Sequence, residues 1–266
     1  MKNNMKRILL LLTIAFLVSC TSQQENNTST EPENDDAEVS SVKKKETPDQ
    51  AIPGFSEVNI DEITPDTNAE GLDTQGIESQ QVAYLFQKGT AAYDNNDFES
   101  GVQYFKQVIA KSPEDPRAYY NLGLGSFKLN EFHEALQAFS KAIQISPNHS
   151  LSIQYRGRVY YMLGDFVKCL EDYNSVVELK PNDPIAFYNR GTARGQIKDY
   201  LGAIKDFDRA IELDPEYADA FFNRGLANLN QGRLHDACYD WEKAYALGHY
   251  EAEKAIRGYC EGQGGE

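Results

Sequence analysis

Few side chains in this sequence could carry out acid–base or metal chemistry, and none belongs to a catalytic pattern. The four histidines are His133, His149, His235 and His249. No Ser–His–Asp order, glycine-rich phosphate loop or zinc-ligand spacing accompanies them, although such chemistry needs these groups together. We expect all four histidines to face solvent. The sequence therefore predicts a protein that is not an enzyme and that has no catalytic residue, metal site or cofactor.

The acidic run Asp94-Asn95-Asn96-Asp97 begins like a calcium-binding loop. Phe98 follows the run and the glycine that such a loop needs is missing. We interpret the run as a turn between helices, with Asp97 as a helix N-cap.

The charge of the chain argues against nucleic-acid binding. The 266 residues are 41% hydrophobic and 25% charged, and the net charge is −15. Residues 1–80 contain 6 basic and 15 acidic side chains (−9), and residues 81–266 contain 20 basic and 26 acidic ones (−6). Nucleic-acid binding requires a basic surface, and the longest basic run is Lys43-Lys44-Lys45.

The N-terminus is typical of a targeting segment. Basic residues precede an apolar stretch from Ile8 to Val18, which is too short to span a bilayer. The stretch leads into Leu17-Val18-Ser19-Cys20, which resembles a bacterial lipobox. The resemblance implies that residues 1–19 are a signal peptide and that Cys20 carries lipid; the alternative is an ordinary secretory peptide with a chance cysteine. Thr21 replaces the aspartate that retains such proteins at the inner membrane, which favours the outer membrane, facing the periplasm or the cell surface.

Residues 20–80 show neither helical nor strand periodicity. Gln, Asn, Ser, Thr, Glu, Asp and Pro dominate this stretch, which cannot bury enough apolar surface to offset the entropy of ordering. The composition predicts an acidic, disordered linker.

From residue 81 a strict repeat begins. Pro113, Pro147, Pro181 and Pro215 follow one another at one fixed interval, which is the period of a helix–turn–helix unit. The same interval separates five glycines (Gly89, Gly123, Gly157, Gly191 and Gly225), five aromatic residues (Phe105, Phe139, Tyr173, Phe207 and Trp241) and five small residues (Gly101, Ala135, Cys169, Ala203 and Ala237). We expect each glycine to face the small residue of the second helix, so that the two backbones approach closely, and each proline to end a helix.

This pattern resembles the tetratricopeptide repeat family. The resemblance covers residues 81–251 as five units, 82–115, 116–149, 150–183, 184–217 and 218–251, and residues 252–266 are expected to form a capping helix and tail. It implies an all-α, right-handed superhelical solenoid, preceded by the disordered linker. Gly101, where alanine is usual in the family, makes unit one look like a degenerate end repeat.

Two sets of residues are expected to join neighbouring elements. Arg190 and Arg224 are predicted to pair with Asp172 and Asp206 of the preceding unit, because the second helix of one unit runs antiparallel to the first helix of the next. Cys238 and Cys260 are expected at the same level on the last unit and the capping helix. A disulfide between them and two free thiols both remain open, while Cys169 is expected to be a buried thiol.

The first helices line the concave face of such arrays, and one row there contains aromatic and amide side chains. The row consists of Phe86, Tyr120, Asn121, Gln154, Tyr188, Asn189, Phe222 and Asn223. Aromatic rings give a large contact area, and amides bond to peptide backbone. These residues either form a peptide-binding groove or are simply usual in the family. The predicted function is a membrane-anchored scaffold that binds a protein or peptide partner in the cell envelope; the alternative is a self-associating structural component, a homo-oligomer.

Overall fold

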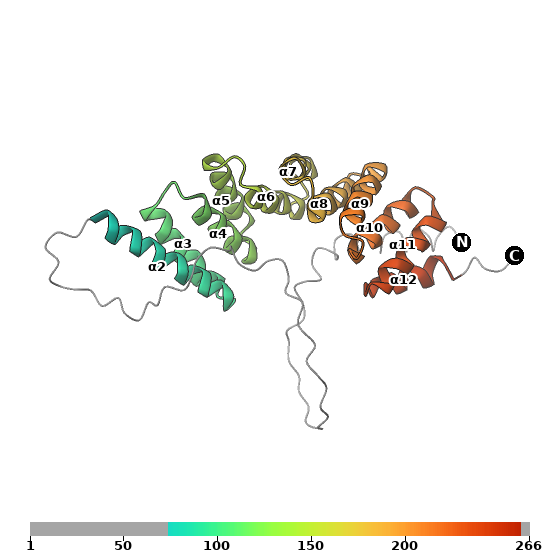
Figure 1. The fold of residues 1–266 in the computed structure, drawn as a ribbon, viewed down its shortest axis with the longest axis horizontal. Helices are drawn as coiled ribbons and strands as arrows, with labels where there is room; N and C mark the ends of the chain where they lie inside the picture. Colours follow the sequence, from blue (N-terminus) through green and yellow to red (C-terminus); the bar gives the residue numbers. More distant parts are fainter. Residues whose placement is uncertain (1–73, 262–266) are drawn as a thin grey trace, which may run out of the picture.

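The computed structural model describes residues 74–261, with side chains from residue 78 onward, and this part of the chain is entirely helical (Figure 1). The predicted signal peptide, Cys20 and most of the predicted linker lie outside the described residues. The helices are α2 (Thr74–Asp94), α3 (Phe98–Lys111), α4 (Pro116–Lys128), α5 (Phe132–Ile145), α6 (Ser150–Met162), α7 (Phe166–Leu179), α8 (Pro184–Gln196), α9 (Tyr200–Leu213), α10 (Ala218–Asn230), α11 (Leu234–Ala246) and α12 (Glu251–Tyr259).

The helices form five consecutive pairs, α2–α3 to α10–α11, followed by the single helix α12, and each packs on its neighbours in the chain. The result is an elongated array with α2 at one end and α12 at the other (Figure 1). This is the predicted solenoid of five units and a terminal helix. The first helix, α2, begins at Thr74 and therefore before the predicted start of the array at Gln81. In the described part of the chain, no helix is both long and apolar enough to cross a bilayer.

Short turns of fixed geometry join the two helices of a unit. In all five turns one residue, at the same position of the repeat, has a positive φ: Asn96, Asn130, Gly164, Lys198 or Gly232. The predicted N-caps are confirmed for three second helices, since carboxylate oxygens of Asp97, Asp165 and Asp199 accept hydrogen bonds from backbone N–H groups at 3.0, 3.2 and 3.0 Å.

The closest contact inside each unit is between the glycine of the first helix and the aromatic ring of the second. A Cβ atom placed on these glycines would lie between 2.5 Å (Gly225 to Trp241) and 3.0 Å (Gly157 to Tyr173) from ring atoms. The rings are almost completely buried. The prediction that the glycine faces the small residue of the second helix is therefore wrong. The glycine is needed because an aromatic ring lies against the backbone of the first helix at that position.

Gly101 has a structural cause of its own. The ring of Tyr93, on the preceding helix, occupies the space that a side chain at Gly101 would fill. The Tyr93 hydroxyl donates a hydrogen bond to the Asn121 carbonyl at 2.7 Å and so joins units one and two.

Arginine and aspartate pair within units, not in the predicted manner between them. Arg156 donates two hydrogen bonds to Asp172 (2.9 and 2.6 Å), and Arg190 likewise to Asp206 (3.0 and 2.7 Å). Arg224 contacts Asp240 in the same way, with its shortest bond at 2.6 Å. The two helices of a unit are antiparallel, so that residues 16 apart in sequence lie at the same height along the helices and their side chains meet. The three aspartates are buried.

The same arginines also reach the preceding unit through their remaining nitrogen. Arg224 Nη1 donates to Asp208 at 2.6 Å, and Arg190 Nη1 donates to Asn174 at 3.2 Å. In both cases the acceptor lies 16 residues before the arginine. Neighbouring units are thus linked, but through these residues and not through Asp172 or Asp206.

We predict that Gly123→Ala lowers the free energy of unfolding by about 1–3 kcal/mol, because the new Cβ would lie 2.6 Å from the fully buried Phe139 ring. Urea unfolding followed by circular dichroism measures the change. Gly258→Ala is the matched control, since a Cβ there meets nothing within 4 Å, and it should stabilise α12 by about 0.5–1 kcal/mol. A neutral Gly123→Ala would refute the ring contact as the constraint.

Candidate functional site

The predicted row of eight residues lies on the first helices but is unevenly exposed. Phe86 is on α2, Gln154 on α6 and Asn189 on α8, and all three are half-buried. The other five are buried, with exposed fractions from 9% for Tyr120 to 1% for Asn223: Tyr120, Asn121, Tyr188, Phe222 and Asn223. These five contribute to the packing of the array, so only three members of the row are available to a partner.

A second ring explains why the aromatic members are buried. Tyr120 contacts His149 with ring centroids 5.5 Å apart, Tyr188 contacts Tyr217 at 4.9 Å, and Phe222 stacks on His249 at 4.1 Å. His149 and Tyr217 lie in the loops that lead to the next first helix, each slightly less than one repeat after the ring it covers. In units one and three that loop position is Asp115 or Asp183, which leaves Phe86 and Gln154 half-exposed.

Two of the three asparagines already use their amide groups inside the protein. Asn223 Nδ2 donates to the Tyr188 hydroxyl at 2.9 Å, and Asn121 Nδ2 donates to the Arg117 carbonyl at 2.8 Å. Asn189 makes no side-chain hydrogen bond within the described residues and is half-buried. It is therefore the asparagine of the row that can bond to a peptide backbone.

Two arginines that sequence reasoning missed lie beside this row. The Arg117 guanidinium lies over the Phe86 ring at 5.4 Å, and that of Arg158 lies over the Phe127 ring at 5.1 Å. Each pair joins consecutive first helices. Arg117 is also paired with Asp115, with Nη2 to Oδ2 at 2.7 Å, whereas Arg158 has no ion pair within the described part of the chain. In both pairs the arginine follows the ring at the same sequence spacing, slightly less than one repeat, and this shared spacing is the signal that could have identified them.

The expectation of four solvent-facing histidines is correct for His133 and His235 and wrong for the other two. His149 is the N-cap of α6, where its Nδ1 accepts a hydrogen bond from Ser152 N–H at 3.3 Å. Burial lowers the pKa of His149 below its usual 6.5, and the nearby Asp115 carboxylate opposes this shift. His249 lies on Phe222, and its side chain is only 10% exposed. Both histidines thus have packing roles.

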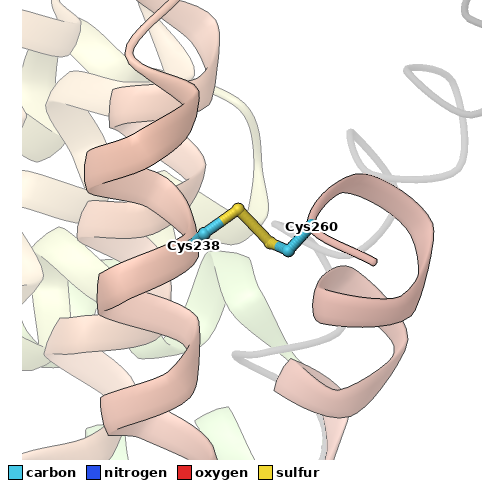
Figure 2. The surroundings of a disulfide bond; sticks show 2 residues. All are labelled: Cys238 and Cys260. Atoms are coloured by element: carbon cyan, nitrogen blue, oxygen red, sulfur yellow. A yellow bond between two sulfur atoms is a disulfide. The ribbon is translucent and has the colours of Figure 1, made fainter. Parts of the chain in front are cut away.

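Cys238 of α11 and Cys260, which follows α12, are joined by a disulfide (Figure 2). Their Cα atoms are 5.8 Å apart, and 22 residues separate them in sequence. The bond holds α12 against α11, where Tyr259 packs on Trp241 with ring centroids 5.6 Å apart. Tyr259 stands one repeat after Gly225 and therefore occupies the glycine position of the repeat. Cys169 is buried and is not part of a disulfide.

Residues 94–97 form the end of α2 and a turn, with Asp97 as the N-cap of α3. Within the stretch 74–261, no cluster of three or more His, Cys, Asp or Glu side chains could hold a metal ion.

Sequence models of known protein families identify the family of the array. A tetratricopeptide repeat model matches residues 86–150, and a TPR repeat model matches residues 157–198 and 196–232. The chain belongs to the tetratricopeptide repeat family. No functionally curated protein matches it significantly.

Solved structures of tetratricopeptide proteins share the fold at low sequence identity. MamA from Desulfovibrio magneticus RS-1 is 22% identical, with a TM-score of 0.60 over 63% of this chain and 94% of that one. YrrB, described as a TPR protein with an unusual peptide-binding site, is 22% identical, with a TM-score of 0.60 over 69% of this chain and 97% of that one. A tetratricopeptide protein from Parabacteroides merdae is 22% identical, with a TM-score of 0.62 over 68% and 74%.

We predict that array stability depends on pH through His149. Its lowered pKa means that the unfolded chain binds a proton more readily, so stability should fall as pH decreases through 6.5 towards the folded-state pKa. In His149→Asp the cap stays ionised until about pH 4, so the loss should move to lower pH. Thermal unfolding of both proteins between these pH values tests this, and identical pH profiles would contradict it.

We predict that the disulfide is a main stabiliser of α12. Closing a loop of 22 residues should contribute about 3 kcal/mol, which Cys238→Ser with Cys260→Ser removes. Trp241, the single tryptophan of the chain, is fully buried next to Tyr259 and reports on the docking of α12. Its emission should shift to the red at lower urea in the double variant than in the parent. A dithiol should shift the parent curve to that of the variant and leave the variant unchanged.

Proposed function

We propose that this protein is a non-enzymatic scaffold that binds a protein or peptide partner and is anchored to a membrane of the bacterial cell envelope through lipid on Cys20. Tetratricopeptide arrays are in general protein-interaction scaffolds. Recruitment, and not catalysis, is then the mechanism: the anchor defines the location and the array selects the partner, whose local concentration rises.

The observation that carries the proposal is a set of half-buried side chains on the first helices: one aromatic ring and three polar side chains without a hydrogen bond or ion pair among the described residues. We define the partner face as Phe86, Gln154, Arg158 and Asn189. These residues come from α2, α6 and α8, and all are half-buried. They are held by packed neighbours, so that little entropy is lost when a ligand binds.

The chemistry of these residues fits an extended peptide. The Asn189 and Gln154 amides can each donate to a backbone carbonyl and accept from a backbone N–H. The Arg158 guanidinium, stacked on Phe127, can bind a carboxylate or a carbonyl with its edge. YrrB, with the same fold, is a precedent for peptide binding by such an array.

The anchor is supported by the order of features at the N-terminus. Basic residues, the apolar stretch Ile8 to Val18 and Ser19-Cys20 follow one another as in a lipoprotein signal. Several acyl chains on one cysteine would hold the chain firmly, at about 0.8 kcal/mol per buried CH2 group. Residues 21–73 then separate the lipid from the array, and Thr21 favours the outer membrane.

We predict that Gln154→Ala, Arg158→Ala and Asn189→Ala together abolish partner capture without loss of helicity. Crosslinking of the lipidated protein in living cells, followed by identification of what it captures, makes the measurement. Glu171→Ala with Lys205→Ala is the matched control, since both residues are exposed on second helices and should not affect capture. Capture that survives the triple change would exclude the partner face.

Replacing the buried members of the row gives no such test. Tyr120→Ala or Phe222→Ala should cost about 3–5 kcal/mol, because each removes a buried ring. Capture of only the protein's own copies in the crosslinking experiment would favour the alternative, a self-associating envelope component.

A further inference from the structure

Two neighbouring units expose aliphatic side chains at their turns. Leu163 and Val167 belong to the α6–α7 turn region and are 52% and 68% exposed. Ile197 and Leu201 belong to the α8–α9 turn region and are 48% and 52% exposed. We call these four residues the turn patch. Aliphatic side chains this exposed on the turns of two consecutive units require an explanation, because scattered single ones are the norm on a soluble surface.

The repeat shows that the packing of a unit does not require these residues. Leu163 and Ile197 occupy one repeat position, where units one and five have Asn95 and Gln231. Val167 and Leu201 occupy another position, where units one, two and five have Glu99, His133 and His235. Both positions thus tolerate polar residues, and only units three and four are aliphatic at both.

The two edges of the array differ in charge. The turns within units lie along one edge and the loops between units along the other, since the helices alternate in direction. The four loops from Ser112–Asp115 to Asp214–Tyr217 contain five acids and one base, a net charge of −4: Glu114, Asp115, Asp183, Asp214 and Glu216 against Lys180. The five turns contain four acids and two bases, a net charge of −2: Asp97, Glu131, Asp165 and Asp199 against Lys198 and Arg233. Around the turn patch itself, Asp165 and Asp199 are balanced by Lys168 and Lys198.

We propose that the turn patch is a membrane-contact surface, which inserts into the headgroup region of the bilayer to which the chain is anchored. The inference rests on the proposed lipid on Cys20, from which residues 21–73 lead to Thr74. Such a segment spans at most about 180 Å, so the anchor keeps the bilayer within reach of the array. The acidic loop edge would be repelled by anionic lipids, whereas the surroundings of the turn patch, where Lys168 and Lys198 balance Asp165 and Asp199, would not be.

The composition of the patch favours lipid over a protein partner. Protein-binding hot spots are enriched in Trp, Tyr and Arg, and Leu and Val are under-represented in them. The patch contains only aliphatic chains, located at turns on an edge of the array, where they can enter a bilayer without rearrangement of the helices. Contact at this edge would also leave the partner face free and would orient the array on the membrane.

A fluorescent probe at single cysteines tests the contact. In the full lipidated chain, Cys169 is buried and Cys238 and Cys260 are bonded, so Val167→Cys supplies the reactive thiol. An environment-sensitive dye there should shift to the blue in vesicles of phosphatidylethanolamine with a minor fraction of phosphatidylglycerol, and brominated lipid should quench it. His133→Cys, one repeat earlier, and Glu216→Cys, on the acidic edge, are controls whose dyes should remain in water.

The outcomes are distinct. If the chain binds to the vesicles but every dye remains in water, the membrane-contact surface is refuted and the anchor is not. Chain not retained by the vesicles would overturn the anchor and with it this inference. If the dye at residue 167 shifts to the blue without vesicles and the shift depends on protein concentration, the patch binds a second copy of the chain. If the shift requires a captured protein, the patch binds that partner. Either result would refute the lipid contact.

Discussion

The contact between a glycine on each first helix and an aromatic ring on the following second helix is the constraint on which the array depends. The ring lies against bare backbone, where even a methyl group would come within 3.0 Å of it. This contact sets how closely the two helices approach, and with it the level at which the paired arginine and aspartate side chains meet. Five repetitions of one contact give five units of the same shape, which can stack because each presents the same surface to the next.

The Arg–Asp pairs follow from that geometry. Once the helices of a unit are close, Arg190 and Asp206 lie opposite one another. The aspartate is buried, and it accepts two hydrogen bonds from Arg190 and a third from Arg194. The third nitrogen of Arg190 then contacts the preceding unit at Asn174. One side chain therefore connects the packing inside a unit to the packing between units. At the C-terminal end of the array, Tyr259 occupies the glycine position of the repeat, and a disulfide holds α12 against α11.

Other molecules can contact only the side chains that this packing leaves exposed. The rings of Tyr120, Tyr188 and Phe222 are covered by His149, Tyr217 and His249. On the first helices this leaves amides, an arginine and one half-exposed ring, a surface suited to a peptide. At the turns it leaves aliphatic side chains in two units only. The partner face lies along α2, α6 and α8, whereas the turn patch lies just after α6 and α8 and at the starts of α7 and α9. Binding a partner and touching a membrane would therefore use different residues.

The sequence by itself determined the repeat, the number of units, the all-helical fold and the positions of the turns, because the local signals recur from unit to unit at one fixed interval. It also predicted that Cys238 and Cys260 lie at the same height on neighbouring helices. Only the tertiary structure decided which residue each glycine faces, which aspartate each arginine binds and which members of the Phe86–Asn223 row are covered. A period places equivalent residues on equivalent helices, but whether a given side chain points to its own unit, to the next one or to solvent depends on the angle and distance between helices. These are set by all the side chains at the contact together, and no single position in the sequence reveals them.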